Sequence, residues 1–198
     1  MRTSHSHRSR NNLLIPAAAA AMLALVTPSA RAQAVPASLE VPAGNTAFLV
    51  GHAYGTQNYI CTHVRGGFEW TFFGPQATLF DDAGQQIATH FLSPNPDESG
   101  KARATWQHSQ DSSAVWAVAI ANSTDSAFVD PNAIPWLLLR VVGAEDGPIP
   151  NGALSRATYL QRINTQGGLA PEGGCSRALD LGVKALVPYS ADYVFFRR

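Results

Sequence analysis

Residues 57–73 read Gln-Asn-Tyr-Ile-Cys-Thr-His-Val-Arg-Gly-Gly-Phe-Glu-Trp-Thr-Phe-Phe. Two runs that contain aromatic and β-branched residues lie on either side of Arg65-Gly66-Gly67. Such residues favour strands, and glycine readily adopts the positive φ that a tight hairpin turn requires. The stretch therefore predicts two antiparallel strands, at 57–63 and 68–73, joined by a hairpin.

A second hairpin is predicted where Asp81-Asp82-Ala83-Gly84 separates Leu79 from Ile87. The Asp81 side chain would cap the turn, and Gly84 would supply the positive φ of a type I turn followed by a bulge. The acidic pair is therefore interpreted as part of a turn rather than as a catalytic pair.

The same pattern continues along the chain after residue 32, because Gly or Pro interrupts short apolar segments about every ten residues. It predicts an all-β fold, a single-domain β-sandwich or barrel of about ten mostly antiparallel strands. The predicted strands are residues 47–51, 57–63, 68–73, 77–80, 86–91, 104–108, 114–121, 136–142, 157–164 and 189–196.

Residues 1–32 are predicted to be a signal peptide. An arginine-bearing segment without acids, 1–12, precedes an almost unbroken apolar run, 13–26, and small residues precede the predicted cleavage point between Ala32 and Gln33. The alternative is a membrane anchor, but a spanning helix needs about 20 apolar residues and this run is shorter. We therefore expect a secreted or periplasmic protein, without a stable membrane anchor, whose single domain covers residues 33–198.

The charge balance of that domain argues against nucleic acid as a partner. Four of the fourteen basic side chains lie in residues 1–32 and no acidic ones do, so ten basic side chains remain against fourteen acidic. A nucleic-acid-binding domain would carry a basic stripe. Only 14% of the chain is charged and 45% is hydrophobic, a balance typical of a folded domain rather than a disordered one.

The chain has two cysteines, Cys61 and Cys175. In an oxidising compartment they would form a disulfide, and a bridge across so long a loop would contribute about 4 to 5 kcal/mol in the chain-entropy model. The alternative is two buried thiols.

Neither a metal site nor a cofactor is predicted. His52, His63, His90 and His108 form no closely spaced ligand motif, although His90 and His108 would face each other if their strands paired. There is no Gly-x-Ser-x-Gly nucleophile motif and no glycine-rich phosphate-binding motif.

A secreted hydrolase with a hidden acid/base pair is one alternative function. Its candidate carboxylates are Glu69, Asp111 and Asp192, which would act together or with His90 and His108. Sequence alone does not pair them, so the enzyme hypothesis has no positive motif.

Aromatic residues favour a binding function, since an exposed aromatic ring suits a sugar or another flat amphipathic ligand. Core packing is the alternative for each of the four tryptophans. Trp106 is the candidate for exposure because it follows a long polar segment, Ser93 to Arg103, and its strand would open at the rim of the fold. Asn122 begins an Asn-Ser-Thr glycosylation motif that matters only in a host with that machinery.

Seven strings of the sequence are distinctive. They are Val41-Pro42-Ala43-Gly44-Asn45, Phe48-Leu49-Val50-Gly51-His52, Tyr59-Ile60-Cys61, Pro75-Gln76-Ala77-Thr78-Leu79-Phe80, Ala133-Ile134-Pro135-Trp136-Leu137-Leu138-Leu139, Gln161-Arg162-Ile163-Asn164-Thr165-Gln166-Gly167-Gly168 and Val187-Pro188-Tyr189-Ser190-Ala191-Asp192-Tyr193-Val194-Phe195. Together they resemble a family of exported bacterial and fungal proteins known as domain of unknown function 3455. The resemblance spans about residues 39 to 196, and it implies no activity, cofactor or partner. It does imply that Cys61 and Cys175 match the family's two cysteines. One departure is the extended segment Ser93 to Arg103.

The string around Arg162 and Asn164 is the most specific of these. Beside a Gly-Gly loop, an arginine and an asparagine would bind an anionic or polar ligand. Alternatively, Arg162 would pair with Asp192, and Asn164 would cap the turn before Gly167, because buried charges need partners.

The function favoured by the sequence is a non-catalytic exported β-domain that binds an extracellular glycan or a small polar molecule. The hydrolase is one alternative, and a cell-envelope interaction or structural protein, with a large exposed apolar patch, is another. The candidate ligand-binding residues are Trp106, Arg162, Asn164, His90 and His108.

Overall fold

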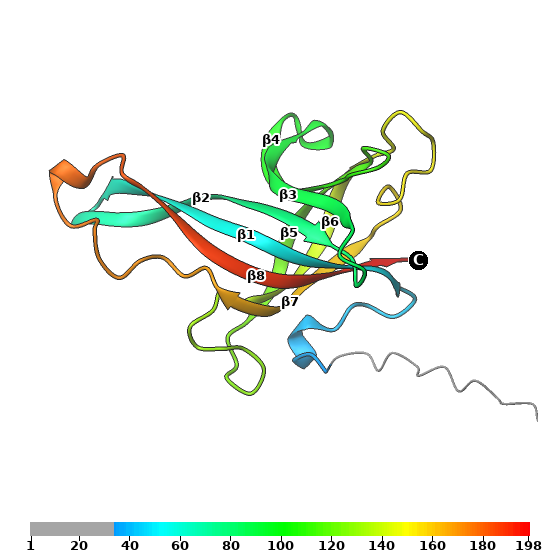
Figure 1. Ribbon diagram of the computed structural model, residues 1–198, viewed down its shortest axis with the longest axis horizontal. Coiled ribbons are helices and arrows are strands. Elements are labelled where there is room, and N and C mark those ends of the chain that lie inside the picture. The colour runs from blue at the N-terminus through cyan, green and yellow to red at the C-terminus, as the bar shows by residue number, and fades with distance from the viewer. Residues whose placement is uncertain (1–33) are drawn as a thin grey trace, which may run out of the picture. The chain divides into compact units, whose positions relative to one another are not determined.

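Eight antiparallel strands, each paired with its neighbours in chain order, close into a barrel where β8 pairs with β1 (Figure 1). The structure, a computed structural model, describes residues 34–198, so the predicted signal peptide lies outside the described residues. The strands are β1 (Thr46–Val64), β2 (Gly67–Phe80), β3 (Gln86–Asn95), β4 (Lys101–His108), β5 (Ala114–Ser123), β6 (Trp136–Glu145), β7 (Tyr159–Gly167) and β8 (Lys184–Arg197). The all-β prediction is confirmed, and of its two architectures the barrel is the observed one.

Two pairs of predicted strands are each a single long strand, which is why eight are found rather than ten. Residues 47–51 and 57–63 both belong to β1, and 68–73 and 77–80 both belong to β2. Gly55 does not interrupt β1. A Cβ there would lie 2.0 Å from the Gln76 carbonyl oxygen, so glycine lets the two strands approach closely.

The predicted hairpin turns are both present. Gly66 and Gly67 have φ values of 105° and 156° between β1 and β2. After β2, one carboxylate oxygen of Asp81 accepts hydrogen bonds from the backbone N–H groups of Ala83 and Gln85, and Gly84 has a φ of 75°.

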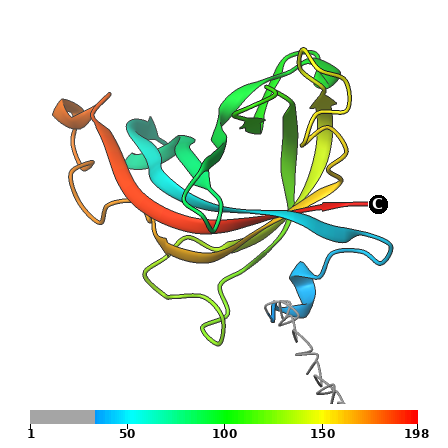
Figure 2. The ribbon, with the colours of Figure 1, turned by 45° about the vertical axis from the view of Figure 1, so that its right-hand side comes forward.

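Part of the sheet extends beyond the barrel as an arm. β2 pairs with β3 only from Ala77 to Phe80, whereas its earlier residues pair with β1 alone. β8 follows β1 outward as far as the pair Ile60 and Lys184. Figures 1 and 2 show β1, β2 and β8 projecting together. In this arm Cys61 is bonded to Cys175, with 5.4 Å between their Cα atoms, which confirms the predicted disulfide.

The hydrophobic core lies inside the barrel. Its buried members are Ala53, Ala77, Leu79, Ala88, Trp106, Val115, Ala117, Ile134, Leu139, Leu154, Ala157, Leu160, Tyr189, Ala191, Tyr193 and Phe195. One of them, Leu154, comes from the loop between β6 and β7, and its backbone N–H donates to Ser113 Oγ. This loop therefore supplies a buried side chain to the core and is held to the start of β5.

A second, smaller cluster lies on the other face of β6 and β7. Leu39, in the short 3₁₀ helix η1 (Ala37–Leu39), is buried there with Trp136, Val129 and Ile163. Gln161 Nε2 donates to the Leu39 carbonyl oxygen at 2.7 Å. The segment before β1 is thus attached to the outer face of the sheet.

The segment Ser93 to Arg103, which was expected to be a loop, is mostly strand. β3 continues to Asn95, the 3₁₀ helix η2 (Pro96–Glu98) makes the turn, and β4 begins at Lys101. Arg103 donates two hydrogen bonds to the Glu98 carboxylate, and the bond from Arg103 together with one from Asn95 lowers the pKa of Glu98 to about 2. The ion pair at the turn explains why so polar a segment is ordered.

Candidate ligand-binding site

A cavity of about 150 Å³ lies inside the barrel, and most of the side chains around it are apolar. Its polar lining residues come from four different strands, so closure of the barrel brings together groups far apart in sequence. The lining residues are Gln57, Phe72, Pro75, His90, Leu92, Ala104, Trp106, Ala117, Ala119, Leu137, Leu139, Arg162 and Tyr193.

Arg162 is placed in this cavity by strand alternation. Leu160, two residues earlier on β7, belongs to the interior core, whereas Gln161 and Ile163 pack on the outer face. Nε and Nη2 of Arg162 both donate to the carbonyl oxygen of Pro135, at 3.2 and 2.8 Å.

The predicted ion pair between Arg162 and Asp192 does not form. Among the described residues, no carboxylate lies within 4.0 Å of the Arg162 guanidinium. The two side chains point to opposite faces of the sheet, because Ile163, on the outer face, is the residue that pairs with Asp192.

Trp106 and His90 form an aromatic stack inside the barrel. Trp106 is 0% exposed, so the expectation that it opens at the rim is wrong. His90 pairs with Trp106 across β3 and β4, whereas His108 pairs with Ala88, so the two histidines do not face each other. The rings of His90 and Trp106 are 4.1 Å apart and nearly parallel, and Tyr193 packs edge-on against both.

Two N–H donors of the lining residues are buried without an acceptor. Trp106 Nε1 and Gln57 Nε2 have no hydrogen-bond partner among the described residues. Burial raises the pKa of the nearby Tyr189 and Gln57 opposes that rise, but no hydrogen bond of ordinary geometry joins the two side chains. An unsatisfied buried donor costs about 1 to 3 kcal/mol, so these groups mark a place where an acceptor would bind.

The ionisable groups around Arg162 are neutral at ordinary pH. The pKa of His90 is lowered to about 3, chiefly by burial and also by the charge of Arg162. A hydrogen bond with the Thr105 carbonyl oxygen acts in the opposite direction but does not offset burial. Nδ1 of His90 therefore donates to Thr105, and Nε2 is left as an acceptor. Burial also raises the pKa of Tyr193.

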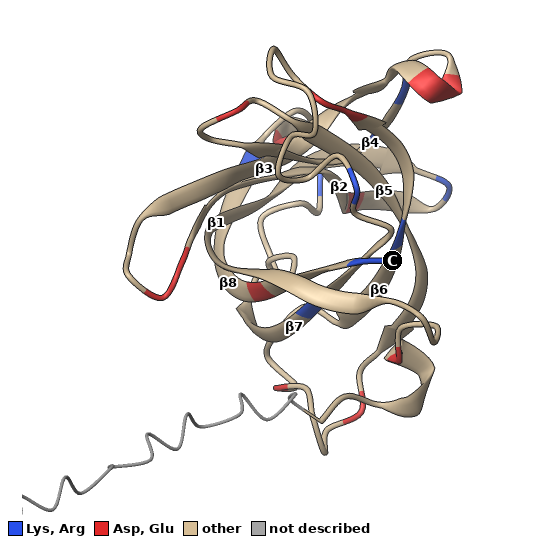
Figure 3. Cartoon of the chain, turned by 90° about the vertical axis from the view of Figure 1, so that its right-hand side faces the viewer, with Lys and Arg blue, Asp and Glu red and all other residues tan. Residues whose placement is uncertain are grey.

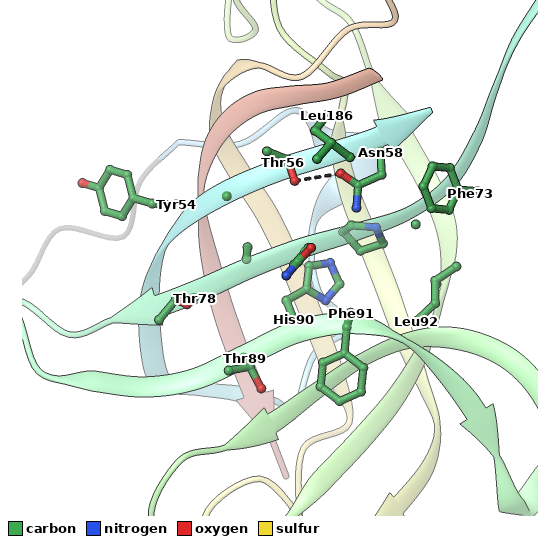
Figure 4. A pocket seen from close by; sticks show the side chains of 15 residues that line it. Tyr54, Thr56, Asn58, Phe73, Thr78, Thr89, His90, Phe91, Leu92 and Leu186 are labelled. Carbon is green, nitrogen blue, oxygen red and sulfur yellow. Dashed lines mark hydrogen bonds between the residues drawn. The ribbon is translucent and has the colours of Figure 1, made fainter. Parts of the chain in front are cut away.

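An open groove of about 870 Å³ lies next to the cavity on the outside of β1, β2 and β3. Figure 4 shows Thr56, Asn58, Thr78 and Thr89 along this groove, with Phe73, Phe91, Leu92 and Leu186 around it. Pro75, His90 and Leu92 line both the groove and the cavity. They are therefore the residues that separate the interior from the outside.

Gln57 is a member of the site that sequence reasoning missed. Its only signal is its position in β1, two residues before Tyr59 and four after Ala53, both of which are buried. A polar residue at an inward-facing position of a strand looks the same in sequence whether it binds a ligand or is hydrogen-bonded within the core.

Asn164 lies elsewhere, at an outer site with Asp192. It has a φ of 52°, and its Nδ2 donates to Asp192 Oδ2 at 2.7 Å. The other oxygen of Asp192 contacts His52 Nδ1 at 2.6 Å, and His52 Nε2 contacts Asp82 at 2.8 Å. Hydrogen bonds to Asp82 and then Asp192 raise the pKa of His52. His52 and Asp82 were not predicted to meet, because their contact depends on the register of β1 and β2, in which His52 pairs with Phe80.

His108 and Asp111 form part of a turn. Asp111 Oδ1 lies 3.0 Å from His108 Nδ1 and accepts from the backbone N–H and the hydroxyl of Ser113, while Oδ2 accepts from the Ala153 N–H. Ser113 Oγ also accepts from the Leu154 N–H. This cluster ties the β6–β7 loop to the turn between β4 and β5.

The predicted carboxylates are not brought together. Glu69 lies on the arm beside Cys175, Asp192 lies on the outer face with His52, and Asp111 lies in the turn before β5. Within residues 34–198 no group of three His, Cys, Asp or Glu side chains is arranged to hold a metal ion. The described part of the chain also contains no helix long and apolar enough to span a membrane.

Comparison with known proteins identifies the family of the chain. No curated protein and no solved structure matches it. Residues 42–197, which include all eight strands, match the model of the family described as Protein of unknown function (DUF3455). The chain therefore belongs to this family, as the resemblance in its sequence implied.

Proposed function

We propose that this protein is an exported, non-catalytic β-barrel that binds a small molecule in its interior. The observation that carries the proposal is the cavity, whose lining side chains include two buried donors, Trp106 Nε1 and Gln57 Nε2, without acceptors. Eight-stranded barrels are just wide enough to be filled by side chains or to hold one small ligand.

The size of the cavity favours a small polar molecule over a glycan. A cavity of about 150 Å³ accommodates a molecule about as large as benzene. Trp106, the aromatic residue expected to present a platform for a sugar, is buried under His90 and Tyr193. The outer groove would hold whatever part of a longer ligand remains outside.

Export remains part of the proposal. The disulfide between Cys61 and Cys175 supports an oxidising compartment, where such bonds form and persist. It agrees with the signal peptide predicted for residues 1–32. Secretion or the periplasm would give the barrel access to extracellular small molecules.

A screen of small molecules with a cavity-filling variant tests this function. Ala104 lines the cavity, and Ala102, on the same strand, is exposed. Compounds that raise the melting temperature of the wild type are expected to lose affinity for Ala104→Leu, because the added side chain occupies their volume. Ala102→Leu is the control and should change the dissociation constant by less than about twofold.

Two outcomes would contradict the proposal. One is a broad library in which no compound stabilises the wild type. The other is a set of compounds that bind Ala104→Leu and wild type equally well.

A second candidate function, interaction with the cell envelope, is supported by exposed apolar side chains at the start of β8 and in the segment just before it. Leu179, Leu181, Val183 and Leu186 are all exposed, and Leu179 is 87% exposed. Such a surface favours docking. If it does dock, the double change Leu179→Ser with Leu181→Ser should release the protein from envelope fractions, and unchanged retention would exclude this role.

A further inference from the structure

We propose, on the basis of the interior site inferred above, that the ligand is a small monocarboxylate with a flat apolar body, and that Arg162 is its counter-ion. Nothing in the family description assigns such a ligand. Three features of the cavity carry the inference: its charge, its donors and its walls.

The charge of the cavity is a single positive one. Arg162 is the only Lys, Arg, Asp or Glu among the residues that line it. No described carboxylate balances this guanidinium, and the phenol of Tyr193 beside it is held neutral by burial. Arg162 is part-buried, and a charge that is partly withdrawn from water is stabilised by a paired anion, so an anion is the group that suits the cavity. One cation fits a monoanion better than a phosphate, which carries more charge.

The donors match a carboxylate. The bonds to Pro135 use two of the five N–H groups of Arg162. Arg162 also hydrogen-bonds the Tyr193 phenol. Its other N–H groups, together with Trp106 Nε1 and Gln57 Nε2, offer donors from three strands around one small space. An ionised carboxylate only accepts hydrogen bonds and has about four acceptor positions, so it would satisfy both orphaned donors and pair with the guanidinium.

The remaining walls fit an apolar body. Ala104, Ala117 and Ala119 leave space that larger side chains would occupy, and Leu137 and Leu139 line the same cavity. The volume corresponds to one ring of about benzene size. Benzoate combines such a ring with one carboxylate, and benzamide is a neutral molecule of nearly the same shape.

Titration calorimetry with benzoate and benzamide at constant ionic strength tests the inference. Wild type is expected to bind benzoate at least about tenfold more tightly than benzamide, a difference that corresponds to about 1.4 kcal/mol. Arg162→Gln should weaken benzoate by about tenfold or more and benzamide by less than about threefold, because only the carboxylate uses the charge. Arg140→Gln is the matched control, because Arg140 is exposed on β6 outside the cavity lining.

Arg162→Gln removes the guanidinium that donates to the Pro135 carbonyl oxygen, and this loss could itself disturb folding. A second variant controls for that effect. Arg162→Lys keeps the positive charge and should keep the preference for benzoate. Equal affinity for the two probes in the wild type, or loss of the preference in Arg140→Gln as well, would overturn the inference.

The proposed function fails in a different way. Neutral compounds could bind the wild type and lose affinity for Ala104→Leu, while benzoate does not bind. In that case the proposed interior site is correct and the proposed carboxylate ligand is wrong. If neither probe binds and no library compound does, both proposals are wrong. Water alone would then satisfy Trp106 Nε1 and Gln57 Nε2.

Discussion

His90 and His52 show how the same side chain takes opposite protonation states in one barrel. His90 is 4% exposed, stacked on Trp106, and has a carbonyl oxygen as its hydrogen-bond partner. His52 is partly exposed, and each of its ring nitrogens faces a carboxylate, Asp82 or Asp192. A ring with both nitrogens donating is protonated, whereas a buried ring without an acid partner is neutral.

The neutral state of His90 predicts a loss of stability in acid. Its pKa in the folded protein is about 3, below the ordinary value of 6.5, so the unfolded chain takes up the proton first as the pH falls. The contribution of neutral His90 to the unfolding free energy is complete above about pH 6.5. It decreases as the pH falls toward 3, by at most about 1.4 kcal/mol per pH unit. Denaturation by urea should show a smaller acid-dependent loss for His90→Gln than for wild type. His63→Gln, an exposed control on the arm, should follow the wild type; identical slopes for all three would refute the assignment.

His52 predicts the opposite dependence. Its folded-state pKa is raised, chiefly by Asp82 and then Asp192, so its stabilisation is present below about pH 6.5 and is lost as the pH rises through the folded value. The difference in unfolding free energy between wild type and His52→Gln should therefore be larger at about pH 5 than at about pH 9. A difference that grows with pH would mean that the two carboxylates do not hold the imidazolium.

At the level of elements, the disulfide holds the segment between β7 and β8 against the arm. Cys61 is in β1, whereas Cys175 is in the segment between β7 and β8, and Trp70 Nε1 adds a hydrogen bond to the Gly173 carbonyl oxygen. The barrel core contains neither cysteine. The bridge therefore attaches a glycine-rich segment to the arm and does not support the core.

Reduction of the disulfide should loosen this segment first. Hydrogen exchange measured with and without reductant is expected to accelerate in residues 169–183 while amides of β3 to β6 keep their protection, because local opening follows local contacts. Uniform loss of protection across the barrel would contradict this expectation.

The close approach of β1 and β2 gives a second prediction at this scale. In Gly55→Ala the new Cβ would lie 2.0 Å from the Gln76 carbonyl oxygen, so the strands would have to separate beside the groove. The unfolding free energy should fall by about 2 kcal/mol or more. Gly173→Ala is the control, since nothing lies within 4 Å of a Cβ there, and it should be nearly neutral. Equal stability of the two variants would show that the strands adjust freely.

Strand positions could largely be predicted from sequence, but their continuity could not. Turn residues such as Asp81 and Gly84 act locally, so both hairpins were predicted correctly. Gly55 looks like a strand end in sequence, whereas its role is set by the carbonyl oxygen of another strand. The polar segment before Trp106 suggested a rim, but the ion pair between Glu98 and Arg103 folds that segment into a hairpin.

For the whole molecule, barrel closure determines which candidates share a site. Arg162, His90 and Trp106 were predicted candidates, and closure places all three around one cavity together with Gln57, which was missed. Asn164 and His108 lie outside it, on the outer face and at the β4–β5 turn. Figure 3 shows acidic residues mainly at loops around the barrel. None of the residues that line the cavity is acidic. The types of these residues suggested them as candidates. Which of them line the same cavity depends on the register of the strands and on the pair of strands that closes the barrel.

The indole N–H signals of the protein in nuclear magnetic resonance test the interior site most directly. Trp106 Nε1 and Trp136 Nε1 are both buried without an acceptor, but Trp106 lines the cavity and Trp136 lies under the segment that contains Leu39. At saturating benzoate the Trp106 Nε1–H signal should move downfield as it gains a hydrogen bond, while that of Trp136 stays in place. A stationary Trp106 signal, or movement confined to the other tryptophans, would contradict binding inside the barrel.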